Sequence, residues 1–240
     1  MLLRVGTSGY SYKEWKGTFY PADLPPSKML PFYAERFSTV EINNTFYRMP
    51  APAMLDGWAA QVPHGFRFAL KAPQRITHQK KLADAGDDVR FLVETAATLG
   101  EKLGPLLFQL PPFLRCDLPR LRAFLEVLPA GVGAAFEFRH DSWSDPGVTE
   151  TLAERGAALC AADSEDRPLD HLTSTATWGY LRLRRTDYDD AALQRWADRI
   201  AAAPWKEAWI FFKHEEEGKG PAYGSRFLEI AAGCGLQVAE

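Results

Sequence analysis

The sequence predicts an α/β protein with a single (β/α)8 TIM-type barrel over residues 1–240. Eight short runs rich in β-branched and aromatic residues alternate along most of the chain with segments of helical periodicity. Such alternation over ~250 residues is typical of a TIM-type barrel. A doubly wound open sheet would carry a glycine fingerprint such as GxGxxG after its first strand, and GTSGYS (6–11) is not that motif. The barrel is therefore the favoured architecture.

The eight strands are expected at residues 2–8, 39–43, 67–72, 104–110, 133–139, 157–163, 179–184 and 208–214. Helices are expected at residues 27–37, 51–62, 88–103, 118–128, 146–156, 191–203 and 221–233. Two aspartates mark helix starts, Asp117 before LPRL and Asp145 before Pro146, because a side-chain oxygen there accepts a free backbone N–H. The segment 164–177 has no clear helical pattern, so the sixth βα unit is expected to be irregular.

Composition excludes several classes of protein. With 46% hydrophobic and 25% charged residues the chain can bury a large core, which disfavours disorder. No apolar run reaches the ~18 residues of a membrane span, and the N-terminal residues do not read as a secretory signal. Three widely spaced cysteines without CxxC suggest neither a disulfide framework nor a thiolate metal site. A cytoplasmic protein without a membrane partner is expected.

Polar residues stand at the ends of the predicted strands, where barrel enzymes carry their chemistry. Within three strands they share one face, because side chains alternate along a strand. The strand-end residues are Thr7, Ser8, Glu41, Asn43, Lys71, Gln109, Glu137, Arg139, Asp163, Arg182, Arg184 and Lys213. Apolar neighbours such as Phe136 and Phe138 are expected to pack on the helices, with the charged set facing the barrel mouth. A single Glu and Arg pair can be purely structural, but several converging on one end favour a ligand site.

The charges at this mouth are mostly basic. Five lysines and arginines outnumber the three carboxylates Glu41, Glu137 and Asp163, which predicts a small phosphorylated or otherwise anionic ligand. The carboxylates could act as catalytic acid and base, or they could only orient the arginines; both interpretations stay open. The net charge of −3 gives no reason to favour nucleic acid as a general partner.

No cofactor is predicted, and a divalent metal is the alternative. His78, His140 and His214 follow strands and could join carboxylates in a mixed nitrogen and oxygen site, but neither HxH nor HExxH is present. Aromatic residues in the loops, including Tyr47 and Trp143, either cover the core or form a stacking wall for a ring.

Several long blocks resemble the YecE-like domain of unknown function 72 family. They are VGTSGYSYKEWKGTFYP (5–21), YAERFSTVEINNTFYRMP (33–50), KAPQRITH (71–78), LGPLLFQLPPFL (103–114), AFEFRHDSW (135–143) and FKHEEEGKGP (212–221). The resemblance implies a TIM-type barrel and a cytoplasmic protein of bacterial or archaeal type, and it brings no reaction with it. At the last strand this chain has Phe-Lys-His where many members have an Asn-rich end, so roles for Lys213 and His214 transfer less well.

The family's recurring polar positions fall on matching residues of this chain. They are Thr7, Ser8, Tyr12, Trp15, Glu41, Asn43, Thr45, Tyr47, Arg48, Lys71, His78, Gln109, Glu137, Arg139, Trp143, Asp163 and Arg182. The leading hypothesis is an enzyme of hydrolase or isomerase/lyase type in which Arg139 and Arg182 grip an anion and Glu41 or Glu137 moves protons. The alternatives are a metal-dependent phosphodiester hydrolase acting on nucleic acid and a non-catalytic ligand-binding protein.

Overall fold

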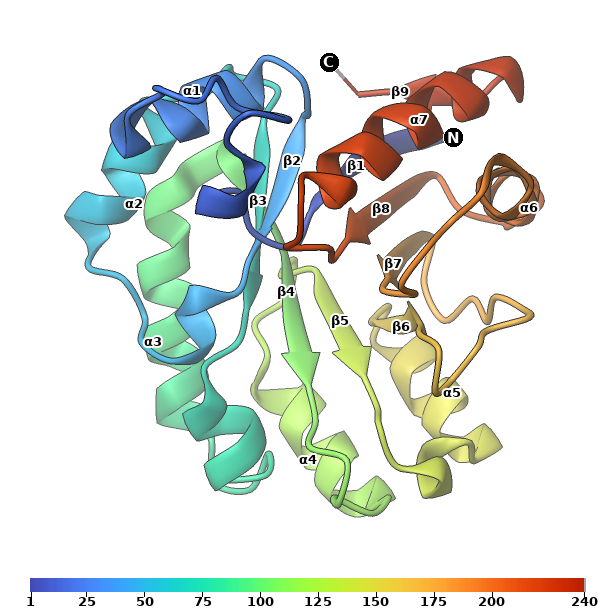
Figure 1. The fold of residues 1–240 in the computed structure, drawn as a ribbon. Helices are drawn as coiled ribbons and strands as arrows, with labels where there is room; N and C mark the ends of the chain where they lie inside the picture. The colour runs from blue at the N-terminus through green and yellow to red at the C-terminus, as the bar shows by residue number, and fades with distance from the viewer. Residues whose placement is uncertain (240) are drawn as a thin grey trace.

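The computed structural model describes residues 1–239, which form one curled parallel sheet with helices along its outer side (Figure 1). The strands are β1 (Leu2–Thr7), β2 (Thr39–Ile42), β3 (Arg67–Lys71), β4 (Leu103–Gln109), β5 (Ala134–Glu137), β6 (Ala158–Asp163), β7 (Trp178–Leu183), β8 (Glu207–Phe212) and β9 (Gln237–Val238). Their order is β2-β3-β4-β5-β6-β7-β8-β1-β9. All eight predicted strands are present, and the two-residue β9 was not predicted.

Seven α-helices cover the sheet in the described chain. They are α1 (Met29–Ala34), α2 (Pro52–Ala59), α3 (Gly86–Ala96), α4 (Leu118–Val127), α5 (Pro146–Glu154), α6 (Asp190–Ala201) and α7 (Lys219–Gly233). The predicted caps are confirmed: Asp117 accepts from the Arg120 N–H at 3.0 Å, and Asp145 accepts from the Gly147 N–H at 2.7 Å. Residues 164–177 contain no helix, as expected for the sixth unit.

The predicted closed barrel is corrected to an open sheet at the seam between β1 and β2. Within the described residues these strands share one isolated bridge, Ser8 with Glu41, and no ladder. The Tyr33 hydroxyl of α1 replaces ladder bonds, since it accepts from the Thr7 N–H at 2.8 Å and donates to the Thr39 carbonyl at 3.0 Å. A Cβ at Gly6 would lie 2.0 Å from the Thr39 carbonyl oxygen, so the two edges still come very close.

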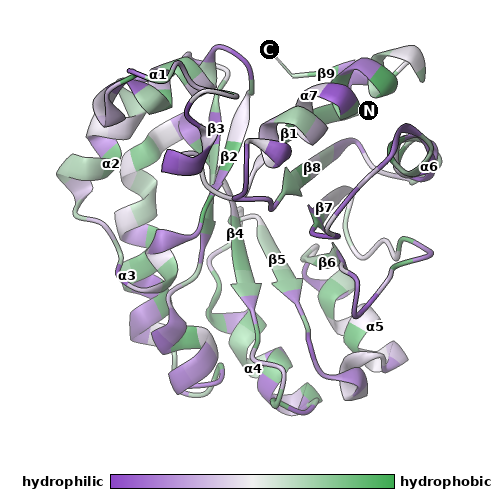
Figure 2. Cartoon of the chain, in the orientation of Figure 1, coloured by the Kyte–Doolittle hydropathy of each residue, from purple (hydrophilic) through white to green (hydrophobic). Residues whose placement is uncertain are grey.

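The core lies in layers on both sides of the sheet. Val40, Phe136 and Leu181 pack on the outer side against helices, which confirms the predicted strand parity. The inner side holds a smaller apolar cluster that includes Tyr180 and Phe211. In Figure 2 the strands are mostly hydrophobic, and hydrophilic colour appears at the arrow tips of β4 and β5. The apolar inner layer therefore gives way to polar residues at the carboxyl edge of the sheet.

Candidate functional site

Arg182 on β7 joins two carboxylates from distant strands. Its Nη1 donates to Glu137 Oε2 at 2.6 Å, and its Nη2 donates to Glu41 Oε1 at 2.9 Å. The three side chains are at most 2% exposed. Parallel strands bring their carboxyl ends to one edge, which is why β2, β5 and β7 can place these residues together. With Arg139 and Arg184 they are named here the Arg182 cluster.

Glu41 is saturated with hydrogen bonds. Besides Arg182, its carboxylate accepts from the Ser8 hydroxyl at 2.7 Å, the Tyr180 hydroxyl at 2.7 Å and Asn43 Nδ2 at 3.2 Å. Burial raises the pKa of Glu41, but the Arg182 charge and the hydroxyl hydrogen bonds outweigh it and lower the pKa overall. Glu41 is therefore a buried, ionised acceptor.

Glu137 is held in the same way by four donors. Besides the Arg182 hydrogen bond, its carboxylate accepts from Gln109 Nε2 at 2.9 Å, Arg139 Nε at 3.2 Å and Arg184 Nη2 at 3.1 Å. Burial raises the pKa of Glu137, and the charges of Arg182, Arg184 and Arg139 overcome it and lower the pKa far below its usual range. Glu137 therefore has no proton to donate at neutral pH.

Two lysines add further positive charge at this edge of the sheet. Burial, with a further contribution from Arg182, lowers the pKa of Lys71 to about 8. The pKa of Lys213 is lowered for the same two reasons, and its Nζ lies 4.0 Å from Glu215. Lys71, Arg139, Arg184 and Lys213 are named here the mouth cations. With Arg182 they make five cationic side chains against the three carboxylates of Glu41, Glu137 and Glu215.

Two cavities meet at the Arg182 cluster. One has a volume of about 720 Å³ and includes Glu137, Phe138 and Cys160 in its lining, and the other has about 510 Å³ and includes Lys213 and Lys219. Both are lined by Arg139 and Arg184, as well as by Ser164 and Asp166. These volumes are in the range of small-molecule sites.

The larger cavity forms where two neighbouring strands separate. β5 and β6 pair at only two positions, Ala135 with Ala158 and Phe136 with Leu159. Beyond them β6 continues beside β7, and the chain after β5 turns toward Trp143. The segment after β6 lines the opening through residues such as Arg167. The short ladder thus opens the sheet at its carboxyl edge.

The family model described as protein of unknown function DUF72 matches residues 4–237. The chain belongs to the DUF72 family. UPF0759 protein YecE of Escherichia coli K12 is 34% identical over 156 residues, which is 65% of this chain and 55% of that protein, so the match spans about half the length of this relative. UPF0759 protein YunF of Bacillus subtilis 168 is 26% identical over 233 residues, covering 90% of this chain and 80% of that one.

Solved DUF72 structures share the fold. A DUF72 family protein from Thermotoga maritima MSB8 aligns with a TM-score of 0.84 at 25% identity, over 97% of this chain and all of that one. A DUF72 family protein from Enterococcus faecalis V583 aligns with a TM-score of 0.78 at 18% identity, over 96% of this chain and 95% of that one. The curled α/β sheet is thus common to these DUF72 proteins.

Most of the predicted strand-end residues lie at the Arg182 cluster. Asp163 and Thr7 lie elsewhere. Asp163, predicted beside Glu41 and Glu137, contacts the Leu169 N–H at 2.9 Å, the Tyr188 hydroxyl at 3.0 Å and Arg185 Nε at 2.8 Å. It therefore anchors the segment after β6 rather than facing Arg182. Thr7 hydrogen-bonds Tyr33 at the seam.

The predicted aromatic residues occupy two environments. Trp143 is buried, donates to the Leu114 carbonyl at 2.8 Å and stacks on Phe138 with ring centroids 4.3 Å apart. It lines the larger cavity. Tyr47 is 76% exposed, and together with Arg48 it lines a separate groove of about 290 Å³. In the described part of the chain neither Trp143 nor Tyr47 is hydrogen-bonded to the Arg182 cluster.

The three histidines do not converge. His78 lies 2.9 Å from the Thr77 hydroxyl, His140 lies 2.9 Å from the Ser142 hydroxyl, and His214 approaches the Arg185 carbonyl. Among residues 1–239 there is no group of three His, Cys, Asp or Glu side chains placed to hold a metal ion. None of the helices described has the length and apolar character needed to cross a bilayer.

Sequence reasoning missed Tyr180 and the segment after β6. Tyr180 was not among the predicted site residues, although it stands two positions before Arg182 and so shares its face. Ser164, Asp166 and Arg167 lie in an irregular segment without a motif.

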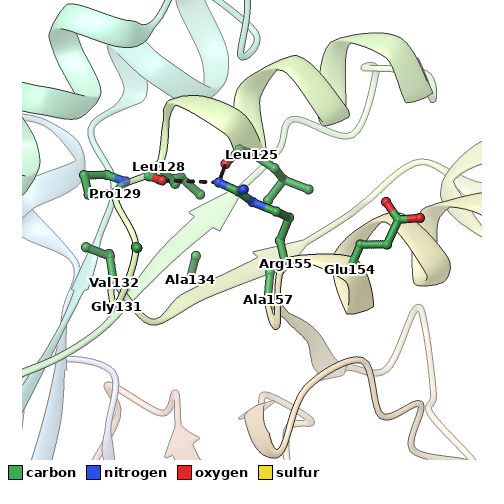
Figure 3. A pocket seen from close by; sticks show the side chains of 10 residues that line it. Leu125, Leu128, Pro129, Gly131, Val132, Ala134, Glu154, Arg155 and Ala157 are labelled. Carbon is green, nitrogen blue, oxygen red and sulfur yellow. Dashed lines mark hydrogen bonds between the residues drawn. The ribbon is translucent and has the colours of Figure 1, made fainter.

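A further cavity of about 280 Å³ lies at the amino ends of β5 and β6 (Figure 3). There Arg155 donates to the Leu125 and Leu128 carbonyls at 2.7 and 3.5 Å, where helix α4 ends. Free carbonyls at a helix end need such donors, so we assign this cavity a structural role.

Proposed function

We propose that this DUF72 protein is an enzyme that binds a small phosphorylated or otherwise anionic substrate at the carboxyl edge of a TIM-like barrel sheet. The surplus of positive charge around the Arg182 cluster carries this proposal. Glu41 and Glu137 are each occupied by four donors, which leaves the mouth cations under-neutralised. An anionic ligand would complete the charge balance.

The arginines keep donor groups free for that ligand. A guanidinium has five N–H donors, and Arg139 and Arg184 each use one on Glu137. The buried Arg184 Nε has no hydrogen-bond partner within the described chain, and Arg184 lines both cavities. A phosphate or carboxylate held by two guanidinium groups is the arrangement that such free donors favour.

The position of the smaller cavity in the fold supports the same class of anionic ligand. TIM-type enzymes frequently bind phosphate with the loops after their seventh and eighth strands and a nearby helix N-terminus. Here Arg184 follows β7, Lys213 follows β8, and Lys219 begins the fifteen-residue helix α7. All three line the smaller cavity. A helix N-terminus adds partial positive charge to the lysines and arginines.

The carboxylates fit an orienting role better than proton transfer. Their lowered pKa values make them weak bases and leave no proton to donate at neutral pH. Glu137 instead fixes the directions of three arginines, and Glu41 fixes Arg182 from the other side. Of the two roles considered from the sequence, holding the anion-binding arginines is the one we propose.

Substitution of Arg139 tests the binding site, because its side chain is partly exposed and Glu137 keeps Arg182 and Arg184. In a thermal-shift panel of inorganic phosphate, sugar phosphates and small carboxylates, the wild type should gain stability with at least one ligand. Arg139→Ala should weaken binding about 10- to 100-fold, the value of a charged hydrogen bond. Arg122→Ala on helix α4 is the matched control. Equal ligand shifts in Arg139→Ala and wild type would refute the site.

The same preparation separates the competing functions. Turnover of a bound ligand in hydrolase, isomerase and lyase assays supports the enzyme, and tight binding without turnover in all of them indicates a ligand-binding protein. Stoichiometric metal in the purified protein, with cleavage of DNA or RNA, would replace the proposal by a metal-dependent phosphodiester hydrolase.

A further inference from the structure

We propose that Lys71 is a nucleophile that forms an imine with the carbonyl group of an anionic substrate. This inference rests on the proposed anion site and narrows its ligand to a phosphorylated or carboxylated aldehyde or ketone. Imine formation draws electrons away from the neighbouring carbon–carbon and carbon–hydrogen bonds. The proposal therefore selects isomerase or lyase chemistry over hydrolysis.

The backbone of Lys71 is fixed at the carboxyl edge. Lys71 is the last residue of β3, and it shares its face with Ala69 of the inner apolar cluster. The Thr45 hydroxyl donates to the Lys71 carbonyl at 2.7 Å. The ammonium nitrogen lies 4.1 Å from the ring centre of Phe46, and the residue is partly exposed. A reactive amine needs this combination of a fixed backbone and a partly exposed side chain.

No carboxylate is free to pair with Lys71. Within residues 1–239 its Nζ makes neither a hydrogen bond nor an ion pair, and its one assigned contact is the Phe46 ring. Glu41 and Glu137 are near enough to influence it electrostatically, but both are held by Arg182. The charged and titratable groups around Lys71 are Glu41, Glu137, Arg139, Arg182 and His78.

This environment increases the neutral fraction of the Lys71 amine. Burial and the Arg182 charge lower the pKa of Lys71 to about 8, so an appreciable fraction is unprotonated near neutral pH. Desolvation next to other cations is a recognised way to activate a lysine for imine formation.

A second half-buried lysine, Lys102, shows that a lysine ammonium group can be hydrogen-bonded elsewhere in the fold. Lys102 Nζ donates to the Ala59 and Val62 carbonyls at 2.5 and 2.7 Å and ties two segments together. Lys71 has no such structural contact. The difference separates a lysine that holds the fold from one left free at the site.

The chemical step balances without an added reagent. The neutral Lys71 amine attacks the carbonyl carbon and forms a C–N bond, and one amine proton moves to the carbonyl oxygen to give a carbinolamine. The second amine proton then moves to the carbinolamine hydroxyl, and the C–O bond breaks to release water as the C=N bond forms. Arg139 and Arg184 would hold the phosphate or carboxylate of the substrate during this step.

Pyridoxal 5′-phosphate is a suitable probe, since it is an aldehyde that carries a phosphate. The folded wild-type protein is incubated with it, reduced with borohydride so that any imine becomes a stable secondary amine, and mapped by peptide mass spectrometry. We expect Lys71 to be labelled at least about tenfold faster than any other lysine near pH 8, because its neutral fraction is larger. Inorganic phosphate should slow the labelling. Lys71→Met should remove it, with thermal unfolding confirming that the variant folds.

Pyridoxal without phosphate separates this inference from the proposed function. Preferential labelling of Lys71 by both aldehydes, with no effect of inorganic phosphate, would keep the nucleophile and refute the anion site. Phosphate-competed binding of pyridoxal 5′-phosphate without preference for Lys71 would keep the anion site and overturn the imine proposal. Labelling spread evenly over the lysines would also overturn it.

Discussion

The inner side of the sheet carries charged residues at both ends, and the two ends are built differently. At the amino end Arg4 pairs with one partner, Glu207, whose Oε1 lies 2.6 Å from Arg4 Nε. Arg4 also donates to the Gly65 carbonyl at 3.1 Å and lies 5.2 Å from the centre of a Trp209 ring. Arg4 and Glu207 form one pair, and the rest of the Arg4 guanidinium contacts neutral groups. Arg67, a second cation nearby, donates to the His64 and Phe66 carbonyls.

At the carboxyl end five cationic side chains lie near Glu41, Glu137 and Glu215. Arg182, Glu41 and Glu137 are buried, whereas the four mouth cations are partly or largely exposed. Burying charge is costly, and a purely structural cluster gains nothing from unbalanced cations. In this class of fold the amino end is associated with stability and the carboxyl end with catalysis. This difference supports the proposal that an anion binds at the carboxyl end, where the positive charge is in excess.

The largest expected effect is on stability, and it should differ between Arg182 at the carboxyl end and Arg4 at the amino end. Arg182→Met leaves two buried carboxylates without their shared partner and should cost about 3–5 kcal/mol in the free energy of unfolding. Arg4→Met breaks a pair that is partly exposed to water and should cost about 1 kcal/mol. Urea denaturation of both variants measures the difference. Equal losses would show that the two ends serve the same structural purpose.

The second largest effect is expected at low pH, where the carboxylates of the carboxyl end should stabilise the fold less. Glu41 and Glu137 have pKa values below those of the unfolded chain, so they stabilise the fold above the unfolded pKa of about 4.3 and lose that contribution as pH falls below it. The free energy of unfolding should therefore drop steadily between about pH 5 and pH 3. Glu137→Gln should make the slope of the free energy of unfolding against pH shallower in this range. An unchanged slope in that variant would contradict the ionised, arginine-held state of Glu137.

A smaller effect is expected for Asp163, which lies outside the Arg182 cluster. Asp163→Asn weakens contacts to Leu169, Tyr188 and Arg185 and should cost about 1–3 kcal/mol. Hydrogen exchange should increase in residues 164–169, while phosphate affinity stays at the wild-type value. A loss of phosphate affinity without a loss of stability would instead place Asp163 in the binding site.

The sequence predicted the elements and much of the cluster because both follow local rules. Strand alternation is a two-residue period, so Glu137 with Arg139 and Arg182 with Arg184 could be assigned to one face. β6 gave no such signal, since ALCAAD has small or apolar residues on both faces, and Asp163 was grouped with the wrong neighbours.

Features that depend on distant segments could not be predicted. The open seam depends on how the Tyr33 hydroxyl of α1 enters between β1 and β2. The larger cavity depends on where the ladder between β5 and β6 stops, and no residue pattern in either strand marks that point. The lowered pKa of Lys71 likewise arises from burial in the folded protein, with a further contribution from Arg182 on another strand.

Binding of inorganic phosphate, measured by isothermal titration at low ionic strength, tests most directly whether the carboxyl end is an anion site. The wild type should bind phosphate, and Arg4→Met should bind it equally well because Arg4 lies at the opposite end. The Arg139→Met/Arg184→Met double variant should bind at least about 100-fold more weakly, since two charged hydrogen-bonding partners are lost. Undiminished phosphate affinity in a folded double variant would contradict the account.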